Sequence, residues 1–210
     1  MIDDYPPALT HRDVGRPGQG WVGTDEPDTD PITVVEADPR WADHFAVEAA
    51  RLRTALAGVA QRIEHVGSTS VPGLPAKPII DIDVWVCDTT DEGRYVPALE
   101  DLGYVLVLRE PWWNEHRMLT RADAPRVNLH VFPSTAPEPL RHLLFRDWLR
   151  SHEDDRDLYA DAKRQIARAT RERPEEYNLA KNEVIDDIYN HVFSVPPTAH
   201  PAWPTGTTEG

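Results

Sequence analysis

The stretch His65-Val-Gly-Ser-Thr-Ser-Val-Pro-Gly-Leu-Pro-Ala-Lys-Pro-Ile-Ile-Asp-Ile-Asp-Val84 decides the fold that we expect for this chain. Its last residues predict a strand with Asp81 and Asp83 on one face and apolar side chains on the other, because side chains alternate along a strand. Two carboxylates on a buried strand are costly unless they are paired, and a hard cation such as Mg²⁺ would explain them best. Gly67 lets the backbone approach a ligand closely, and Ser68 offers a hydroxyl to a phosphate.

This stretch resembles the signature of the GrpB-like family, a branch of the nucleotidyltransferase superfamily. The resemblance covers roughly residues 32–193 and also includes Asp38-Pro-x-Trp41, Asn128-Leu-His-Val131, Phe145-Arg-Asp-Trp-Leu149 and Tyr177…Lys181. It implies an α+β fold, with a nucleotidyltransferase-like mixed β-sheet, flanking helices and a C-terminal helical bundle. The family also occurs as a domain appended to dephospho-CoA kinases. The resemblance therefore also implies a domain that assists folding of the enzyme to which it is attached.

Length and charge limit the class of protein. The 210 residues suffice for one domain with a full core, which we place at residues 31–194 with C-terminal helices over 138–193. Residues 1–30 are acidic and rich in proline, and residues 195–210 lack core formers, so we expect a disordered arm and a flexible tail. The net charge of −14 argues against a nucleic-acid partner. One cysteine, no signal-peptide pattern and no membrane-length apolar run predict a cytoplasmic protein without a membrane partner.

The apolar periodicity predicts the order of the elements. We expect a short strand over 32–36, a helix from Asp38-Pro39 to about residue 57, and strands over 62–66 and 78–86. A helix over 95–102 precedes three strands over 104–109, 116–121 and 126–132, which we expect to form an antiparallel meander. After Pro139 the pattern becomes helical, with one helix over 140–150, a second that includes 158–169, and a third after Pro174.

The expected site combines metal ligands, phosphate contacts and a base. Asp81 and Asp83 are the predicted catalytic and metal-binding carboxylates. Related polymerase-like transferases carry a third carboxylate on a neighbouring strand, but the polar face of residues 126–132 offers Asn128 and His130 instead. His130 is therefore the candidate base, although it can also serve only as a hydrogen-bond partner within the sheet. The predicted nucleotide and phosphate contacts are His65, Gly67, Ser68, Thr69, Lys77, Arg117, Arg126 and Lys181.

These residues favour one function and leave an alternative open. We expect a Mg²⁺-dependent nucleotidyltransferase that transfers a nucleoside monophosphate from a nucleoside triphosphate, with ATP as the expected nucleotide, to a small-molecule acceptor. The alternative is a catalytically inactive nucleotide-binding or folding-accessory module, related to the domain appended to dephospho-CoA kinases, in which the missing third carboxylate marks lost catalysis. The sequence predicts neither the acceptor nor the oligomeric state.

Overall fold

A five-stranded mixed sheet forms the centre of the computed structural model, which describes residues 4–11, 19–22, 32–170 and 173–204. The strands are β1 (Arg62–Val66), β2 (Ile79–Val86), β3 (Val105–Glu110), β4 (His116–Arg121) and β5 (Arg126–Pro133). Their order is β1-β2-β5-β4-β3, in which β2 and β5 are parallel and the other neighbours are antiparallel. The mixed sheet and the meander of β3, β4 and β5 confirm the fold that the sequence predicts.

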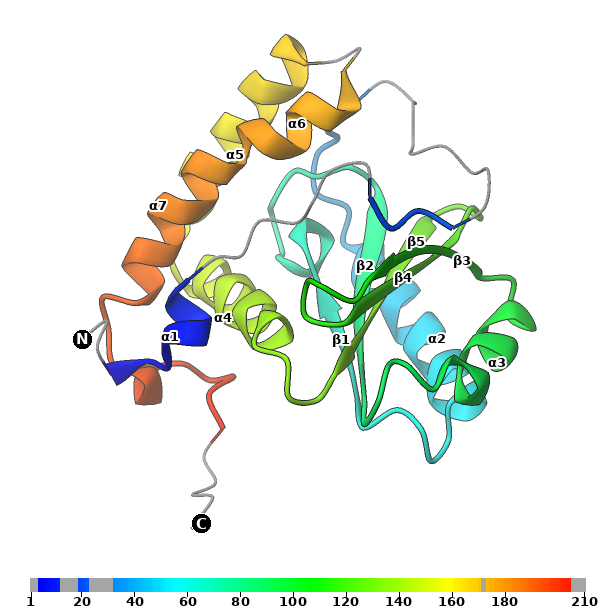
Figure 1. The fold of residues 1–210 in the computed structure, drawn as a ribbon. Helices are drawn as coiled ribbons and strands as arrows, with labels where there is room; N and C mark the ends of the chain where they lie inside the picture. Colours follow the sequence, from blue (N-terminus) through cyan, green and yellow to red (C-terminus); the bar gives the residue numbers. More distant parts are fainter. Residues whose placement is uncertain (1–3, 12–18, 23–31, 171–172, 205–210) are drawn as a thin grey trace.

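The register of the central strands divides the sheet into a polar and an apolar face. Asp81 pairs with Asn128 and Asp83 pairs with His130 in the parallel β2–β5 ladder, so these four side chains share one face. The opposite face carries isoleucine, leucine and valine side chains that form the main core. Helices α2 (Arg40–Ala55) and α3 (Val96–Glu100) cover this apolar face (Figure 1).

Helix α2 forms where the sequence predicts it. The Asp38 carboxylate accepts a hydrogen bond from the Arg40 backbone N–H at 2.9 Å, which satisfies one of the free donors at the start of the helix. The helix buries Trp41, Ala49 and Leu52 along one stripe against the sheet. It ends at Ala55, two residues earlier than expected.

The C-terminal helices lie on the polar side of the sheet. They are α4 (Glu138–Ser151), α5 (Glu153–Ala169), α6 (Pro174–Ala180) and α7 (Asn182–Val192). In Figure 1, α4 stands beside the sheet, and α5, α6 and α7 extend from it as a second group. The third helix of the predicted bundle is divided, because α6 ends at Ala180 and α7 begins at Asn182.

Two other sequence predictions need correction. Residues 32–36 make only one isolated bridge, between Val35 and Ala76, and are not a strand of the sheet. The partner segment contains Pro72, Pro75 and Pro78, which cannot donate backbone hydrogen bonds, so no longer ladder can form there. The helix expected over 95–102 is shorter, since α3 covers only Val96–Glu100.

Parts of the expected arms pack against the domain. Tyr5 and Leu9 are buried, and the short helix α1 (Pro7–Thr10) lies against α4. Trp21 makes a bridge with Leu108 at the edge of β3, and Trp203 packs against the same cluster as Tyr5. The arm and tail predictions therefore do not hold for these residues, whereas most of the expected arm and the last six residues lie outside the described ranges.

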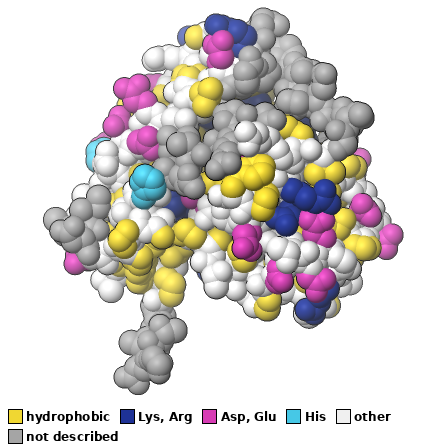
Figure 2. Space-filling model, in the orientation of Figure 1, with side chains coloured by type: hydrophobic (Ala, Val, Ile, Leu, Met, Phe, Trp, Pro, Cys, Tyr) yellow, Lys and Arg dark blue, Asp and Glu magenta, His cyan; other side chains and the backbone are white. Residues whose placement is uncertain are grey.

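The face of the molecule drawn in Figure 2 carries both acidic and basic side chains. On the face drawn in Figure 2, acidic side chains are scattered, and the described basic side chains form small groups without a continuous basic stripe. None of the described helices combines the length and the apolar composition that crossing a membrane requires.

We predict that Tyr5→Ala destabilises the protein by about 3 kcal/mol, the usual loss for a large aromatic side chain removed from a core. The Tyr5 ring lies 4.9 Å from the Phe193 ring and 5.4 Å from the Trp203 ring, and its hydroxyl donates to the Val195 carbonyl at 3.0 Å. Urea unfolding of Tyr5→Ala and of the exposed control His11→Ala measures the difference. Equal stability of the two variants would show that this segment does not dock in solution.

Candidate functional site

The Gly-Ser turn lies directly against the first aspartate of β2. Gly67 has φ 65° and ψ −174°, a backbone conformation that is nearly restricted to glycine. A Cβ atom at Gly67 would lie 2.3 Å from Asp81 Oδ2, so only glycine allows this approach. Ser68 opens a 3₁₀ turn (Ser68–Ser70) immediately after it. The turn therefore packs directly against the Asp81 carboxylate.

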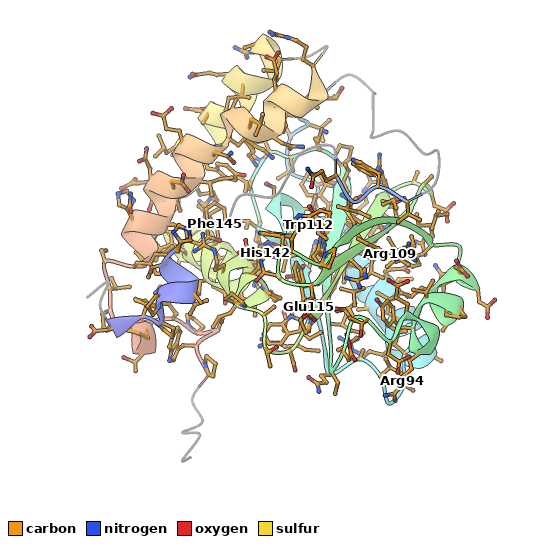
Figure 3. The ribbon with its side chains drawn as sticks, viewed as in Figure 1. Arg94, Arg109, Trp112, Glu115, His142 and Phe145 are labelled. Carbon is orange, nitrogen blue, oxygen red and sulfur yellow. The ribbon has the colours of Figure 1, made fainter. Side chains whose placement is uncertain are left out.

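The two aspartates have different surroundings. Asp81 is partly exposed and accepts a hydrogen bond from Asn128 Nδ2 at 3.1 Å, and His130 Nε2 lies 3.9 Å from its Oδ1. Asp83 has no exposed side-chain surface, and its Oδ2 lies 2.8 Å from His142 Nδ1. Figure 3 shows His142 on α4, between this helix and the sheet. Burial alone would lower the pKa of His142, but the charges of Asp83, Glu138 and Asp81 raise it to about 9.

The residues present fit one magnesium ion held jointly with a substrate. Asp83 Oδ1 and Asn128 Oδ1 are buried oxygens with no hydrogen-bond partner among the described residues. Oxygen ligands of this kind suit Mg²⁺, which commonly takes one or two carboxylates and completes its shell with substrate phosphates and water. Within the described ranges, no three His, Cys, Asp or Glu side chains form a complete metal site.

The chain has 22 lysines and arginines, of which only three are lysines. All three lie near the Gly67-Ser68 turn. Lys163 Nζ of α5 donates to Ser68 Oγ at 3.1 Å and also contacts the Pro75 carbonyl. Lys181 Nζ lies 4.5 Å and Lys77 Nζ 5.6 Å from the centre of the Tyr177 ring. Arginine cannot lose its proton in a protein, whereas a buried lysine can. The lysines of this cluster can therefore be buried in their neutral form.

Burial and mutual repulsion act on the charges of these lysines. Burial, with the nearby charges of Lys181 and Arg164, lowers the pKa of Lys163 to about 6. Burial also lowers the pKa of Lys181 to about 8, with Asp81 opposing and Lys77 adding to the effect. Tyr159 completes the group, because its ring lies 4.6 Å from Lys163 Nζ and Ser68 hydrogen-bonds its side chain. An anion beside these lysines would therefore favour their charged forms.

The structure places the remaining predicted residues differently. His65 lies on the apolar face, where its ring stacks on Phe45 of α2 at 4.7 Å and its Nε2 lies 3.1 Å from Thr69 Oγ1. Thr69 in turn donates to the Ile79 carbonyl at 3.0 Å. His65 and Thr69 therefore stabilise the turn through contacts on the side away from Asp81. Burial lowers the pKa of His65 to about 4, so the ring is neutral near pH 7.

The placement of Arg117 in the phosphate pocket is wrong. Arg117 pairs with Val131 in the β4–β5 register and lies on the apolar side of the sheet. There it is buried and forms an ion pair with Glu92 at 2.7 Å. Arg126, by contrast, shares the face of Asn128 and His130 and starts β5 at the edge of the site.

Three contributing residues escaped the sequence reasoning: His142, Tyr159 and Lys163. The sequence pattern identifies the helix of His142 by its apolar residues and gives no role to the histidine. Its partner Asp83 is 59 residues away, so no local pattern connects the two. Tyr159 and Lys163 are one helical turn apart, a spacing that brings side chains together. A search for the positions of the few lysines in this arginine-rich chain would have found Lys163.

Comparisons with known proteins find the same family over most of the chain. A family profile described as GrpB protein matches residues 31–191. UPF0157 protein BH1888 of Halalkalibacterium halodurans is 48% identical over 167 residues, covering 80% of this chain and 85% of that protein. A dephospho-CoA kinase of Mycobacterium tuberculosis is 29% identical over 196 residues, covering 81% of this chain and 48% of the kinase. The crystal structure of conserved protein GrpB from Enterococcus faecalis is similar with a TM-score of 0.70 and 32% identity, covering 77% of this chain and 98% of that one.

We predict that Gly67→Ala costs about 1–3 kcal/mol of stability and displaces the Asp81 side chain, because the new methyl group would meet that carboxylate in a backbone conformation already strained for alanine. Gly73→Ala is the matched control, since Gly73 also has a positive φ of 79° but has open space around its Cβ position. Urea unfolding compares the two. A loss at Gly67 no larger than that at Gly73 would mean that Asp81 does not press on the turn.

We predict that His142→Ala costs about 3 kcal/mol near neutral pH, at the low end for breaking a buried ion pair, because the His142 side chain is 28% exposed. The raised pKa means that the folded protein holds a proton that the unfolded chain releases near pH 6.5. The wild-type advantage should therefore be full below about pH 6.5 and fall as the pH rises through about 9. Thermal unfolding across this range, with the exposed His44→Ala as control, measures it. A difference independent of pH would contradict the ion pair.

Proposed function

The chain belongs to the GrpB family, and we propose that it is a Mg²⁺-dependent nucleotidyltransferase acting on a small molecule that carries a hydroxyl group. One observation carries the proposal. The Gly67-Ser68 turn, the Asp81 carboxylate and all three lysines of the chain meet at one place. A nucleoside triphosphate presents the complementary charge, and its bound magnesium ion suits the paired aspartates.

The cationic group in this site would bind and orient the triphosphate. Lys163 and Ser68 support a phosphate contact beside the turn, and Lys77 and Lys181 stand around Tyr177 on the same side. Transfer of a nucleotidyl group depends mainly on positioning and on neutralising the developing charge. These side chains supply both, and the tight Gly67 turn keeps them next to Asp81.

The other end of the polar face would serve the acceptor. His130 Nε2 faces Asp81, and its other ring nitrogen is held by a hydrogen bond, which orients the imidazole as a base for a hydroxyl group. When bound, Mg²⁺ polarises the phosphoryl group and neutralises its charge. Asp81 and Asp83 are the residues that would hold it.

A second function is favoured by a specific observation. The described polar face of β5 carries Asn128 and His130 and no carboxylate, and the similarity to dephospho-CoA kinases covers about half of those proteins. A module that binds nucleotide, or that assists the folding of an attached enzyme, would need the turn and the lysines but not a base.

One experiment separates the proposals. Calorimetry with each of the four common nucleoside triphosphates, with and without Mg²⁺, tests binding to the wild type and to Asp81→Asn. Incubation of the protein with α-³²P-labelled triphosphate and a cell metabolite extract then tests for a labelled product and released pyrophosphate. Binding with transfer supports the enzyme, and binding without transfer supports the module. No binding at millimolar concentration overturns both nucleotide proposals.

We predict that triphosphate binding at about pH 7.5 takes up close to one proton, because Lys163 with its pKa near 6 is largely neutral in the free protein and gains its proton beside phosphate. Calorimetry in two buffers of different ionisation enthalpy, such as HEPES and Tris, measures the uptake. It should drop sharply in Lys163→Met, where only the smaller uptake by Lys181 with its pKa near 8 remains, and it should shrink at about pH 5, where both lysines are already charged. An uptake unchanged in Lys163→Met would assign the proton to another group.

A further inference from the structure

Four polar side chains form a line across the sheet, one from each of the neighbouring strands β3, β4, β5 and β2. Glu110 Oε2 lies 2.9 Å from His116 Nδ1, and His116 Nε2 lies 3.0 Å from His130 Nδ1. His130 Nε2 then lies 3.9 Å from Asp81 Oδ1. Both nitrogens of each ring therefore have a neighbour in the line. The line starts in the protein interior and ends at the candidate site.

The middle of the line excludes water. His116 is 2% exposed, its ring stacks on Phe132 at 4.6 Å, and Trp113 packs edge-on against it at 5.1 Å. The charged groups around the two histidines are Asp81 and Asp83 of β2, His142 and Glu138 of α4, and Arg117 of β4. Burial, with the charges of His130, His142 and Arg117, lowers the pKa of His116 well below its usual value, so this ring does not carry a positive charge. Burial raises the pKa of Glu110.

If each of the two imidazoles carries one proton, the hydrogen bonds along the line have only two consistent arrangements. With Glu110 ionised, His116 donates from Nδ1 to Glu110, His130 donates from Nδ1 to His116, and His130 Nε2 is free to accept. With Glu110 protonated, every bond reverses and His130 Nε2 carries the proton toward Asp81. The state of Glu110 thus sets which nitrogen of His130 is basic.

We infer that Glu110, His116 and His130 form a proton relay that serves the proposed transfer reaction, with Glu110 as the final proton acceptor. The acceptor hydroxyl gives its proton to His130 Nε2 and keeps the electron pair with which its oxygen attacks the α-phosphorus. The His130 Nδ1 proton passes to His116 Nε2, and the His116 Nδ1 proton passes to Glu110. Pyrophosphate leaves with the electron pair of the broken P–O bond. Both rings are neutral before and after, and His116 and Glu110 act as positioning residues through His130.

The relay itself is tested without any substrate by ¹⁵N NMR of the histidine side chains in the full-length protein. In the wild type, the proton of His116 should move from Nδ1 to Nε2 as Glu110 becomes protonated, and the His116 ring should not become a cation in that transition. The transition should be absent in Glu110→Gln and unchanged in Glu115→Gln, an exposed glutamate in the turn between β3 and β4. A His116 ring that keeps one tautomer as Glu110 titrates, a cationic His116 intermediate, or persistence of the transition in Glu110→Gln would overturn the relay. The wild-type measurement decides the matter by itself if Glu110→Gln does not fold.

The catalytic part of the inference rests on the proposed function and has its own readout. Glu110→Gln should lower kcat about 10²-fold or more, the lower range for loss of base catalysis, and leave the KM for the Mg²⁺-triphosphate unchanged. Glu115→Gln should keep both constants. An unchanged kcat in Glu110→Gln would remove the relay from the reaction. If the protein transfers no nucleotide at all, the proposed function fails, while the NMR result still shows whether the relay exists.

Discussion

The Asp83 carboxylate lies in the middle of the sheet with no exposed surface, and the packing of α4 on the sheet depends on neutralising its charge. Asp83 would cost several kcal/mol if it were left unpaired at this depth. Helix α4 provides His142 for Asp83 and, one turn later, Arg146 for Glu64 of β1 at 2.8 Å. Glu64 and Asp83 are direct neighbours on adjacent strands. One helical turn rises about 5.4 Å and strands lie about 4.8 Å apart, so the helix matches the spacing of the acids beneath it.

The two faces of the sheet use ion pairs for different purposes. On the apolar side, Glu48 of α2 accepts hydrogen bonds from Tyr104 and Arg121 inside the core, and Glu92 pairs with Arg117. These pairs are enclosed within the layer that holds α2 and the segment before α3. On the polar side, Lys163 comes from α5 and Lys181 from the junction between α6 and α7. They stand next to Ser68 and Asp81 without a bidentate carboxylate partner among the described residues. A ligand can complete the second arrangement but not the first.

Local patterns predicted the sheet and the shared face of Asp81 and Asp83 because both are encoded over short distances. The alternation in Ile79–Val86 sets the faces of Asp81 and Asp83, and the glycine before Ser68 shows where the backbone turns. Arg117 was misplaced because a shift of one residue in strand register moves a side chain to the other face, and nothing near Arg117 in the sequence sets that register. His142 and Lys163 were missed because their partners lie 59 and 95 residues away. The burial of Tyr5 was not predicted, because the acidic, proline-rich sequence around it is typical of a disordered segment.

The contact between Tyr5 and Val195 has a consequence for the order of events during synthesis. These residues are 190 positions apart, so Tyr5 cannot reach its place in the core before Val195 has left the ribosome. At about 5–20 residues per second, that interval is roughly 10–40 s, long compared with the folding of a small domain. The sheet and α2 can form in that time, whereas Tyr5 and the apolar residues of α4 still lack the side chains of α7 and Phe193 that complete their cluster. The apolar side chains of this cluster therefore stay exposed until Tyr5 meets the segment that contains Phe193 and Val195.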